Sequence, residues 1–504
     1  MLQRSYAVAA AIAVVIPVLS TTPSAVAGPA TARSVAASGT ASDADTAVEP
    51  TSVVDVLGKG AAGEYLRDTS GRQVILRGFN TDGRVKVADD CMPRYTEKDI
   101  AKERHDMGTN AVRLLLQWRC VEPSPNVYDD TYLDRVEKLV AAYNAHGMTV
   151  MLDMHQDVYS VAATPGSTAG NGAPAWATHM DGLPVPAKKQ WWEYYVTPGV
   201  TRAWDNFWNK FDNHPELADH YARMWGKVAS RFAGNKGVVG YDLMNEPYTG
   251  NSLPTVVERG PLSTLYQKCV DEIRKADQDS WVFVEPVAFG ANFGRITALQ
   301  KIVDPRAAKP KIAYAPHLYP LGSEGGLSEL SLPLTESVLA TWQAQVRDQA
   351  RRLSPDNSTV PIMLGEFGLN TTKSGSIQYV ENVLAMIGEM GGGAFYYSSD
   401  LGPWGPYDDA GQPRNLRDTM ANCYVPVAAG RIVFQSTAPK RCVMEIDATT
   451  GLSQVYLPRD TFESVQVTGA TIRGWDKKTR TLLIEIPPGE GRRVTVDAGG
   501  KFFL

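Results

Sequence analysis

Short runs of aliphatic and β-branched residues alternate with longer amphipathic stretches from about residue 60 to about residue 428. The long stretches, such as TYLDRVEKLVAAYNAHG, carry apolar residues at helical spacing and end at a glycine, which is typical of surface helices. The short runs have the length and composition of buried strands. They predict eight strands, at Val74–Phe79, Ala111–Leu116, Thr149–Asp153, Val238–Met244, Trp281–Glu285, Ile312–Pro316, Ile362–Gly365 and Ala394–Tyr397.

Strands that alternate with helices lie parallel in one sheet, and eight such strands close into a barrel. An open doubly wound sheet is the alternative, but no glycine-rich phosphate loop follows the first predicted strand. We therefore predict an α/β fold, with a (β/α)8 TIM barrel over residues 51–427.

The pattern changes after about residue 428. Short alternating runs (GRIVFQS, SQVYLP, ESVQVTG, TRTLLIEIP and RRVTVDA) are separated by turn residues and show no helical period. This spacing predicts a small C-terminal β-sandwich over residues 428–504.

The N-terminal segment has a different composition. Arg4 precedes an apolar run from Ala7 to Leu19, and the small residues Ala25-Val26-Ala27 follow it. A bilayer span takes about 20 residues, so the run is too short for a membrane anchor. We expect a signal peptide at residues 1–27, a secreted protein and no transmembrane segment. Residues 28–50 contain no aromatic residue and are expected to form a disordered leader.

Charge and cysteine content limit the possible partners. The formal net charge of −5 argues against a nucleic-acid partner, because phosphate binding needs a basic surface. No CxxC or histidine-rich spacing indicates a metal, and we expect neither a metal nor a cofactor. Among the five cysteines, Cys91 with Cys120 and Cys423 with Cys442 are possible disulfides, and Cys269 is predicted to be a buried thiol.

In a barrel of this kind the reactive residues come from the C-terminal ends of the strands. Glu246 follows the fourth predicted strand and Glu366 the seventh, so the two are expected to face each other across the barrel mouth. Retaining glycosidases need such a pair about 5–5.5 Å apart, one as the nucleophile and one as the acid. Arg113 beside the nucleophile would keep it ionised, and Tyr319 could donate a hydrogen bond to it.

Other polar residues at the strand ends have several interpretations. His155 and His317 are predicted to lie with Arg113 behind the carboxylates and to orient them. Glu285 closes the fifth predicted strand, beside the fourth, where it is poorly placed for attack opposite Glu246. We interpret it as a peripheral or packing residue.

The set Arg113, His155, Asn245-Glu246-Pro247, His317, Tyr319, Glu366 and Trp404 resembles glycoside hydrolase family 5. Within that family, the strings DMHQDVYS, NGAPAWAT, DLMNEP, HLYPL, LGEFGL and GPWGPY resemble the endoglycoceramidases, and the likeness runs from about residue 53 into the C-terminal strands. NEP or GEFG alone is weak evidence for a family, whereas the order, spacing and strand-end placement of all the strings together are specific evidence.

The resemblance implies that Glu246 is the acid/base and Glu366 the nucleophile of a retaining hydrolase. The bond implied is the β-glycosidic bond between an intact oligosaccharide and ceramide in a glycosphingolipid, cleaved by a monomer at a membrane or micelle surface. The matching sugar-contact positions are Lys86, Asp153, His155, Asp157, Trp191, Asn245, Tyr319 and Trp404.

Two alternatives use the same sequence features. A polysaccharide endoglycanase of the cellulase or mannanase kind would employ the same two glutamates, whereas a non-catalytic glycolipid-binding protein would be expected to lose one of them. The loop at Gln156–Val200 is far longer than an ordinary βα connection and is rich in apolar residues, Trp176 and Trp192 among them. Together with Leu321–Leu332, it either walls a groove for a lipid tail or only covers the barrel top.

Overall fold

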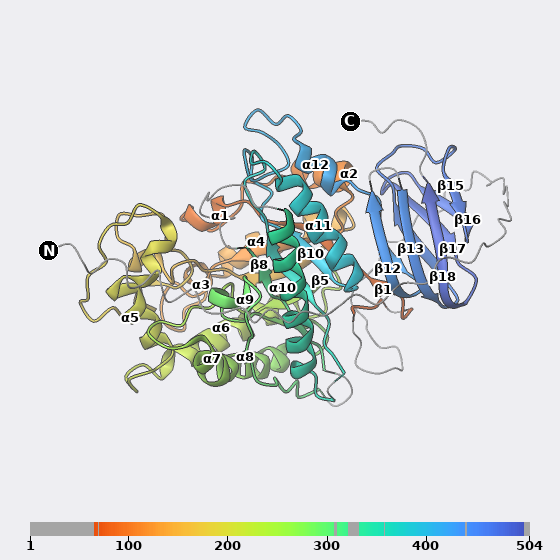
Figure 1. Ribbon diagram of the computed structural model, residues 1–504. Coiled ribbons are helices and arrows are strands. Elements are labelled where there is room, and N and C mark those ends of the chain that lie inside the picture. The colour runs from red at the N-terminus through yellow and green to blue at the C-terminus, as the bar shows by residue number, and fades with distance from the viewer. Residues whose placement is uncertain are drawn as a thin grey trace. The chain divides into compact units, whose positions relative to one another are not determined.

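The computed structural model of the chain describes residues 65–68, 70–306, 310–320, 332–356, 358–438 and 441–497. Within these ranges the chain forms one nine-stranded parallel sheet and two antiparallel sheets (Figure 1). The expected signal peptide and leader lie outside the described residues, as does the stretch 321–331 that was considered as a wall of a lipid groove. None of the helices within the described ranges combines the length and apolarity needed to cross a bilayer.

The parallel sheet is the predicted barrel. Its strands are β2 (Arg77–Asn80), β3 (Ala111–Leu116), β4 (Thr149–Met154), β5 (Val238–Asp242), β6 (Trp281–Val284), β7 (Ile312–Tyr314), β8 (His317–Leu318), β9 (Met363–Phe367) and β10 (Gly393–Tyr396). They lie in the order β7-β6-β5-β4-β3-β2-β10-β9-β8, and a parallel bridge between Tyr314 and Ile362 closes the circle. The TIM-barrel fold class is therefore confirmed.

The sixth predicted strand, Ile312–Pro316, ends early. Only Ile312–Tyr314 forms β7, and after Ala315 and Pro316 a separate short strand, β8, begins at His317, beyond the predicted bounds. Proline has no backbone N–H to donate to a neighbouring strand, which explains the break at this point. The break places His317 at the start of a separate short strand that pairs directly with Glu366 of β9.

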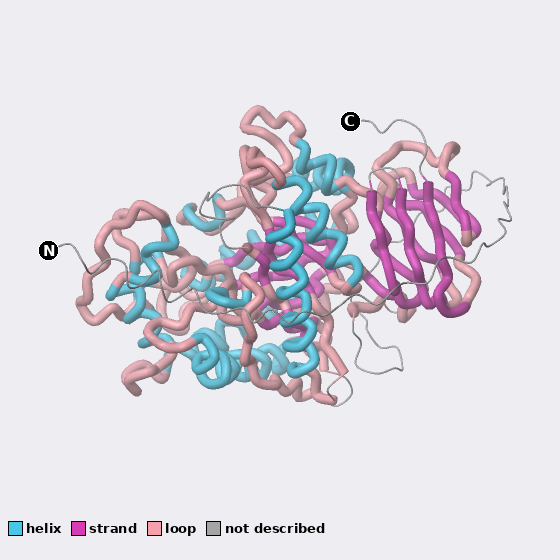
Figure 2. Tube along the Cα trace, viewed as in Figure 1, coloured by secondary structure: helices cyan, strands magenta, loops and turns pink. Residues whose placement is uncertain are grey.

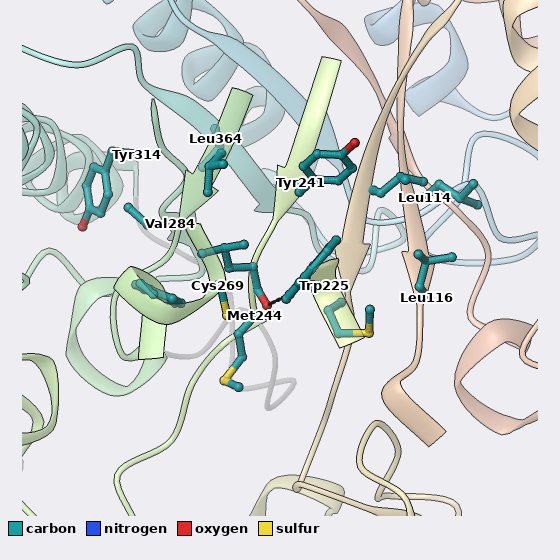
Figure 3. Packing of buried hydrophobic residues seen from close by; sticks show 14 of the residues in the cluster. Leu114, Leu116, Trp225, Tyr241, Met244, Cys269, Val284, Tyr314 and Leu364 are labelled. Carbon is teal, nitrogen blue, oxygen red and sulfur yellow. Dashed lines mark hydrogen bonds between the residues drawn. The ribbon is translucent and has the colours of Figure 1, made fainter. Parts of the chain in front are cut away.

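Helices surround the sheet (Figure 2). Local sequence fixes their starts: Thr96 and Asp99 form a capping box on α2, and Asp129 accepts from the backbone of Tyr132 at the start of α4. Buried side chains from α6, α8 and the strands, such as Trp225, Cys269 and Tyr241, share one apolar cluster (Figure 3). The helices are α1 (Arg84–Val87), α2 (Glu97–Met107), α3 (Trp118–Val121), α4 (Asp130–Ala145), α5 (Pro198–Phe207), α6 (Glu216–Phe232), α7 (Pro254–Val257), α8 (Ser263–Ala276), α9 (Ala288–Ala291), α10 (Leu332–Leu353), α11 (Ser376–Glu389) and α12 (Asn415–Met420).

The alternation of side chains along the strands separates an apolar layer from a polar layer. Ala111 of β3 and Met151 of β4 belong to a buried apolar cluster inside the barrel. Two residues further along the same strands, Arg113 and Asp153 are fully buried and form an ion pair at 2.9 Å. Because residues i and i+2 of a strand share a face, the second pair occupies the same interior one layer nearer the C-terminal ends of the strands.

The C-terminal strands form two antiparallel sheets, as the predicted sandwich requires. One sheet has the order β1-β11-β14-β17-β16 and the other β12-β13-β18-β15. The strands are β1 (Gln73–Val74), β11 (Tyr424–Ala428), β12 (Gly430–Ala438), β13 (Arg441–Ala448), β14 (Leu452–Tyr456), β15 (Gln466–Thr468), β16 (Thr471–Asp476), β17 (Thr481–Glu485) and β18 (Gly489–Asp497).

Two expectations about this region need correction. The first predicted strand, Val74–Phe79, is two strands: β1 pairs with β11 of the C-terminal sheet, and only β2 belongs to the barrel. The division expected at residue 428 falls at the end of β11, so the first C-terminal strand lies ahead of it. Both considered disulfides, Cys91–Cys120 and Cys423–Cys442, are formed, and Cys269 is a buried free thiol.

Candidate active site

Two glutamates meet at the C-terminal ends of the barrel strands. Glu246 lies four residues beyond the end of β5, and Glu366 lies within β9. One carboxylate oxygen of each lies within 4.8 Å of an oxygen of the other. This separation fits the pair of a retaining glycosidase, whereas an inverting pair stands about 6.5–9.5 Å apart to leave room for a water molecule.

Glu366 is held in its ionised form. Arg113 Nη1 donates to its Oε1 at 2.7 Å, and the Tyr319 hydroxyl donates to its Oε2 at 3.0 Å. Burial raises the pKa of Glu366, but the positive charges of His317 and Arg113 outweigh burial and lower the pKa from its ordinary value. A carboxylate that stays charged in a buried place has the character of a nucleophile.

Glu246 has different surroundings. Its Oε1 accepts from Asn292 Nδ2 at 2.8 Å and lies 2.9 Å from His317 Nδ1. Its backbone φ is +44°, in the left-handed region that residues other than glycine rarely adopt. Gln156 Nε2 donates to the carbonyl oxygens of Asn245 and Glu246, both at 2.8 Å, and so fixes this turn.

A cluster of buried charges lies beneath the pair. Arg113 contacts Asp153, Asp242 and Glu285 at 2.8 to 2.9 Å, in addition to Glu366. Burial, and then the charge of Glu285, raise the pKa of Asp242 well above its ordinary value. Burial lowers the pKa of His317, but nearby carboxylates outweigh it, Glu285 and Glu366 foremost, and raise the pKa well above its ordinary value.

The interpretation of Glu285 as a peripheral or packing residue was wrong. Glu285 follows β6 with the same inward parity as Trp281 and Phe283, and only 1% of it is exposed. It lies directly below the catalytic pair, in contact with Arg113 and with the backbone N–H of Glu246.

A cavity of about 410 Å³ opens above the two glutamates. Five of the predicted sugar-contact residues line it: Lys86, Asp157, Trp191, Tyr319 and Trp404. Lys86 Nζ pairs with Asp157 Oδ2 at 2.9 Å and lies 4.4 Å from the ring centre of Tyr397. Burial raises the pKa of Asp157, but the charge of Lys86 outweighs it and the pKa is lowered.

The other three predicted sugar-contact residues, Asp153, His155 and Asn245, lie behind the cavity wall and are at most 1% exposed. Asp153 Oδ2 binds His155 Nδ1 at 2.8 Å, and His155 Nε2 lies 3.4 Å from Asp157. Asn245 Oδ1 accepts from Arg113. These side chains therefore do not line the cavity; they contact Asp157 and Arg113, which in turn contact the cavity or Glu366.

The sequence interpretation did not assign a role to several residues that line the cavity. Tyr397 and Asp400 follow the end of β10, and Asn171 donates to Asp157 at 2.9 Å from the long loop. Asp400 accepts from the backbone N–H of Gly83 at 3.1 Å. The signal for Tyr397 and Asp400 was their place at the end of the eighth predicted strand and just beyond it, the rule that located Glu246 and Glu366.

The long loop at Gln156–Val200 is partly wall and partly cover. Trp191 is 37% exposed and lines the cavity. Trp176 packs edge-on against Trp118, with ring centres 5.4 Å apart, and donates to Glu122, so it belongs to the barrel cover. Trp192 is 43% exposed and is not among the residues that line the cavity.

Three groups of side chains in the described ranges could offer ligands to a metal ion. In one, Arg113 already neutralises Asp153, Asp242 and Glu285. In another, His317 bridges the two catalytic glutamates. In the third, the rings of His179 and His214 stack with their centres 3.9 Å apart, and His214 Nδ1 lies 3.1 Å from Glu216 Oε1.

Comparison with known proteins agrees with this geometry. Residues 67–401 match the family described as Cellulase (glycosyl hydrolase family 5). A solved structure of endo-glycoceramidase II from Rhodococcus sp., a cellobiose-like imidazole complex, is 49% identical to this chain, with a TM-score of 0.82, covering 86% of this chain and 100% of that one. A second structure of that enzyme, a ganglioside GM3 complex, is 48% identical with a TM-score of 0.82, covering 86% and 99% of the two chains.

A curated relative, endoglycoceramidase I from Rhodococcus hoagii (strain 103S), is 29% identical over 343 residues. The match spans 65% of this chain and 65% of that protein's length. The resemblance noted from the sequence motifs is confirmed by these matches. The chain belongs to glycosyl hydrolase family 5 and, within that family, to the endoglycoceramidases.

Proposed function

We propose that this protein is a retaining endoglycosidase that hydrolyses the β-glycosidic bond between an intact oligosaccharide and ceramide in glycosphingolipids. The observation that carries the proposal is the pair Glu246 and Glu366, within 4.8 Å of each other and in contrasting surroundings. The substrate class is supported by the relatives, because the endo-glycoceramidase II structures include a ganglioside GM3 complex and a lactosyl-enzyme intermediate.

In the first step, the Glu366 carboxylate attacks the anomeric carbon of the sugar next to ceramide. The carbon–oxygen bond to ceramide breaks, and Glu246 gives its proton to the departing oxygen. Asn245 donates to the carbonyl of Gln156 at 3.0 Å and accepts from Arg113 at 3.1 Å, and so helps to hold the turn that carries Glu246. The products of this step are ceramide and a glycosyl ester of Glu366.

In the second step, Glu246 takes a proton from a water molecule that attacks the same anomeric carbon, and the ester bond to Glu366 breaks. Two inversions give a sugar with its original β configuration. Tyr319 and Arg113 hold the two oxygens of Glu366, so the departing carboxylate returns to a site already arranged for its negative charge.

The sugar is bound by the polar residues of the cavity. Lys86 and Asp157 offer a charged donor and acceptor to sugar hydroxyls, and Trp404 offers an apolar face from the loop after β10. Asp153 and His155 act from behind, because they orient Asp157 and Arg113.

The lipid is bound on the side of Glu246, where we define an aromatic row made of Trp191, Tyr195, Tyr248 and Phe289. The ring centre of Tyr195 lies 6.3 Å from that of Trp191, 4.7 Å from that of Tyr248 and 5.5 Å from that of Phe289. Phe289 is 40% exposed and belongs to α9, and Asn292 at the end of this helix donates to Glu246. The row therefore borders the acid/base, next to the departing ceramide oxygen.

Hydrolysis of a panel of substrates tests the proposal. The purified protein is incubated with lactosylceramide, galactosylceramide, a ganglioside and a soluble cellulose derivative, and the products are identified by mass spectrometry. Release of a whole oligosaccharide and ceramide is expected. Sugar fragments from cellulose alone would instead establish the polysaccharide endoglycanase, which uses the same two glutamates.

Export and the site of action form a separate part of the proposal. The N-terminal pattern supports cleavage after Ala27, and the glycolipid substrate supports action at a membrane or micelle surface, where we propose that the enzyme acts as a monomer. N-terminal sequencing of the protein from the culture medium of a secreting host is expected to give a chain that starts at residue 28. A chain that keeps Met1 and stays with the cells would contradict export.

A further inference from the structure

One buried carboxylate below the site has no role in the proposed chemistry. Glu285 is 1% exposed, and three different groups use its two oxygens. Oε1 accepts from Arg113 Nη2 at 2.8 Å and lies 3.3 Å from His317 Nε2. Oε2 accepts from the backbone N–H of Glu246 at 2.9 Å.

Two of these three groups, Arg113 and His317, contact the catalytic carboxylates. Arg113 donates to Glu366 through Nη1, a different nitrogen from the one that binds Glu285. His317 contacts Glu246 through Nδ1 and faces Glu285 with the opposite nitrogen of its ring. A single side chain thus fixes the orientation of the cation beside each catalytic glutamate.

The third group is the backbone of Glu246 itself. Its φ of +44° is strained for a residue with a side chain, and such a conformation persists only where the surroundings hold it. Gln156 donates to the carbonyl oxygens of Asn245 and of Glu246 itself, and Glu285 accepts from the N–H of Glu246. The direction of the Glu246 carboxyl group depends on this turn.

We propose that Glu285 is a positioning residue shared by the two catalytic glutamates: it holds the Glu246 turn directly and aims Arg113 and His317 at their partners. This inference rests on the proposed function, because it assigns Glu246 and Glu366 their roles. Glu285 touches neither the substrate cavity nor the reacting atoms, and acts only through the residues it binds.

Electrostatics gives the same residue a second effect. The groups that face His317 and Arg113 are the carboxylates of Glu246, Glu285, Glu366, Asp153 and Asp242. After the opposing effect of burial, Glu285 is the largest of the influences that raise the pKa of His317. Removing this negative charge lowers the pKa of every neighbouring group, acid or base, because the charged cations lose a partner and the remaining carboxylates lose a repulsion.

The test compares Glu285→Gln with Glu122→Gln. Glu122 is a matched control: it is also fully buried, accepts a backbone N–H, from Asn126 at 2.7 Å, and binds a histidine, His220, at 2.7 Å. It contacts neither catalytic glutamate nor the residues that hold them. Both variants lose a buried charged acceptor and are expected to melt at lower temperature than the wild type.

Glu285→Gln alone is expected to lower kcat, by about 100-fold, since a small misplacement of reacting groups costs that much. KM for lactosylceramide is expected to stay within about threefold of the wild type, because the sugar contacts are untouched. The pH profile of kcat/KM is expected to move toward lower pH. An equal loss of kcat in both variants, or no loss in Glu285→Gln, overturns the proposal.

A measurement without substrate separates this inference from the proposed function. With ring-labelled histidine, NMR titration of the folded proteins is expected to show a lower pKa for His317 in Glu285→Gln and an unchanged one in Glu122→Gln. A pKa of His317 that is unchanged in both variants overturns the proposal, whichever substrate the wild type cleaves. If Glu285→Gln does not fold, Glu285→Asp is the second variant. Its side chain keeps the charge but is one methylene too short to reach the Glu246 N–H. A kcat for Glu285→Asp equal to that of the wild type then overturns the proposal.

Discussion

The guanidinium of Arg113 donates to Glu366 Oε1 at 2.7 Å from a position with no exposed surface. Its remaining nitrogens bind Asp153, Asp242 and Glu285, so one cation serves four carboxylates. The rigid five-donor fork of arginine suits this task, and the point charge of lysine does not.

We expect Arg113→Lys to lower kcat/KM by about 10- to 100-fold, the usual cost of removing a group that orients a reactive one. The lowered pKa of Glu366 places the acid limb of the wild-type pH profile of kcat/KM below pH 4.5, the ordinary pKa of a glutamate. In Arg113→Lys this limb is expected to move toward higher pH. Steady-state kinetics from pH 3 to pH 8, with ~0.5-unit steps around the glutamate range, checks this.

Arg274→Lys is the control for Arg113→Lys. Arg274 is also buried and pairs with Asp304 through two nitrogens, both at 3.1 Å, but it contacts neither Glu246 nor Glu366. Both variants are expected to unfold more easily, and only Arg113→Lys is expected to lose activity. A comparable loss in Arg274→Lys would mean that general destabilisation explains the result.

Tyr319→Phe removes the hydrogen bond to Glu366 Oε2 and leaves the rest of the ring in place. A hydrogen bond to a charged group contributes about 1.5–3 kcal/mol, so we expect kcat to fall by about 10- to 100-fold. Tyr379→Phe is a suitable control, since that buried hydroxyl donates to the carbonyl of Leu318 at 3.1 Å and not to the catalytic pair. Full activity of Tyr319→Phe on lactosylceramide would show that Glu366 does not need this donor.

Phe289→Ala shortens the exposed end of the aromatic row. If the row binds ceramide, KM for lactosylceramide is expected to rise by about 10-fold, the effect of losing part of a buried aromatic contact. Hydrolysis of a soluble aryl lactoside is expected to stay unchanged. Phe211→Ala removes a ring that is 49% exposed, against 40% for Phe289, and that packs on Arg202 outside the row. This variant is expected to change the hydrolysis of neither substrate. Equal effects of Phe289→Ala on both substrates would place the ring in sugar binding.

Glu103 of α2 links stability to pH. Burial raises its pKa from an ordinary 4.5 to about 7. The folded state therefore holds a proton that the unfolded state releases between these values. The contribution of Glu103 to stability is fully present below pH 4.5 and is lost as pH rises to about 7, by about 3 kcal/mol in all. We expect Glu103→Gln to melt at a higher temperature than the wild type at pH 8 and to differ little at pH 4. Glu97→Gln, at an exposed site in the same helix, is expected to leave the melting temperature unchanged at both pH values. A melting curve of Glu103→Gln at pH 8 that equals the wild-type curve would contradict Glu103 as the source of the pH dependence.

The strands and the catalytic pair could be predicted because they depend on local pattern. Ala111–Leu116 was predicted with the bounds of β3, since a strand buried on both faces is a largely apolar run bounded by polar turns, here with Arg113 as its one polar residue. Glu246 and Glu366 were located by a rule that any barrel obeys, that reactive groups follow the strands. The GPWGPY motif located Trp404, whereas Trp191, which lies in a less distinctive stretch, was located by the family resemblance alone; both line the cavity.

The errors come from pairing and from depth, which the local pattern does not encode. Val74 and Phe79 belong to one apolar run, yet β1 pairs with a strand more than 300 residues away. Asp153 lies in β4, and His155 and Asp157 follow this strand, but only Asp157 reaches the cavity. Asp153 turns toward Arg113, and His155 lies between Asp153 and Asp157. Glu285 could have been placed by its parity with Phe283, had the inward face of that strand been identified.

The most direct test of the central claim is NMR of the sugar released from lactosylceramide in the first minutes of reaction. The pair Glu246 and Glu366 predicts intact lactose in its β form, which only later mutarotates, together with one ceramide for each lactose. Lactose that appears first as the α form, or release of single sugars in place of the disaccharide, would contradict a retaining endoglycosidase built on these two glutamates.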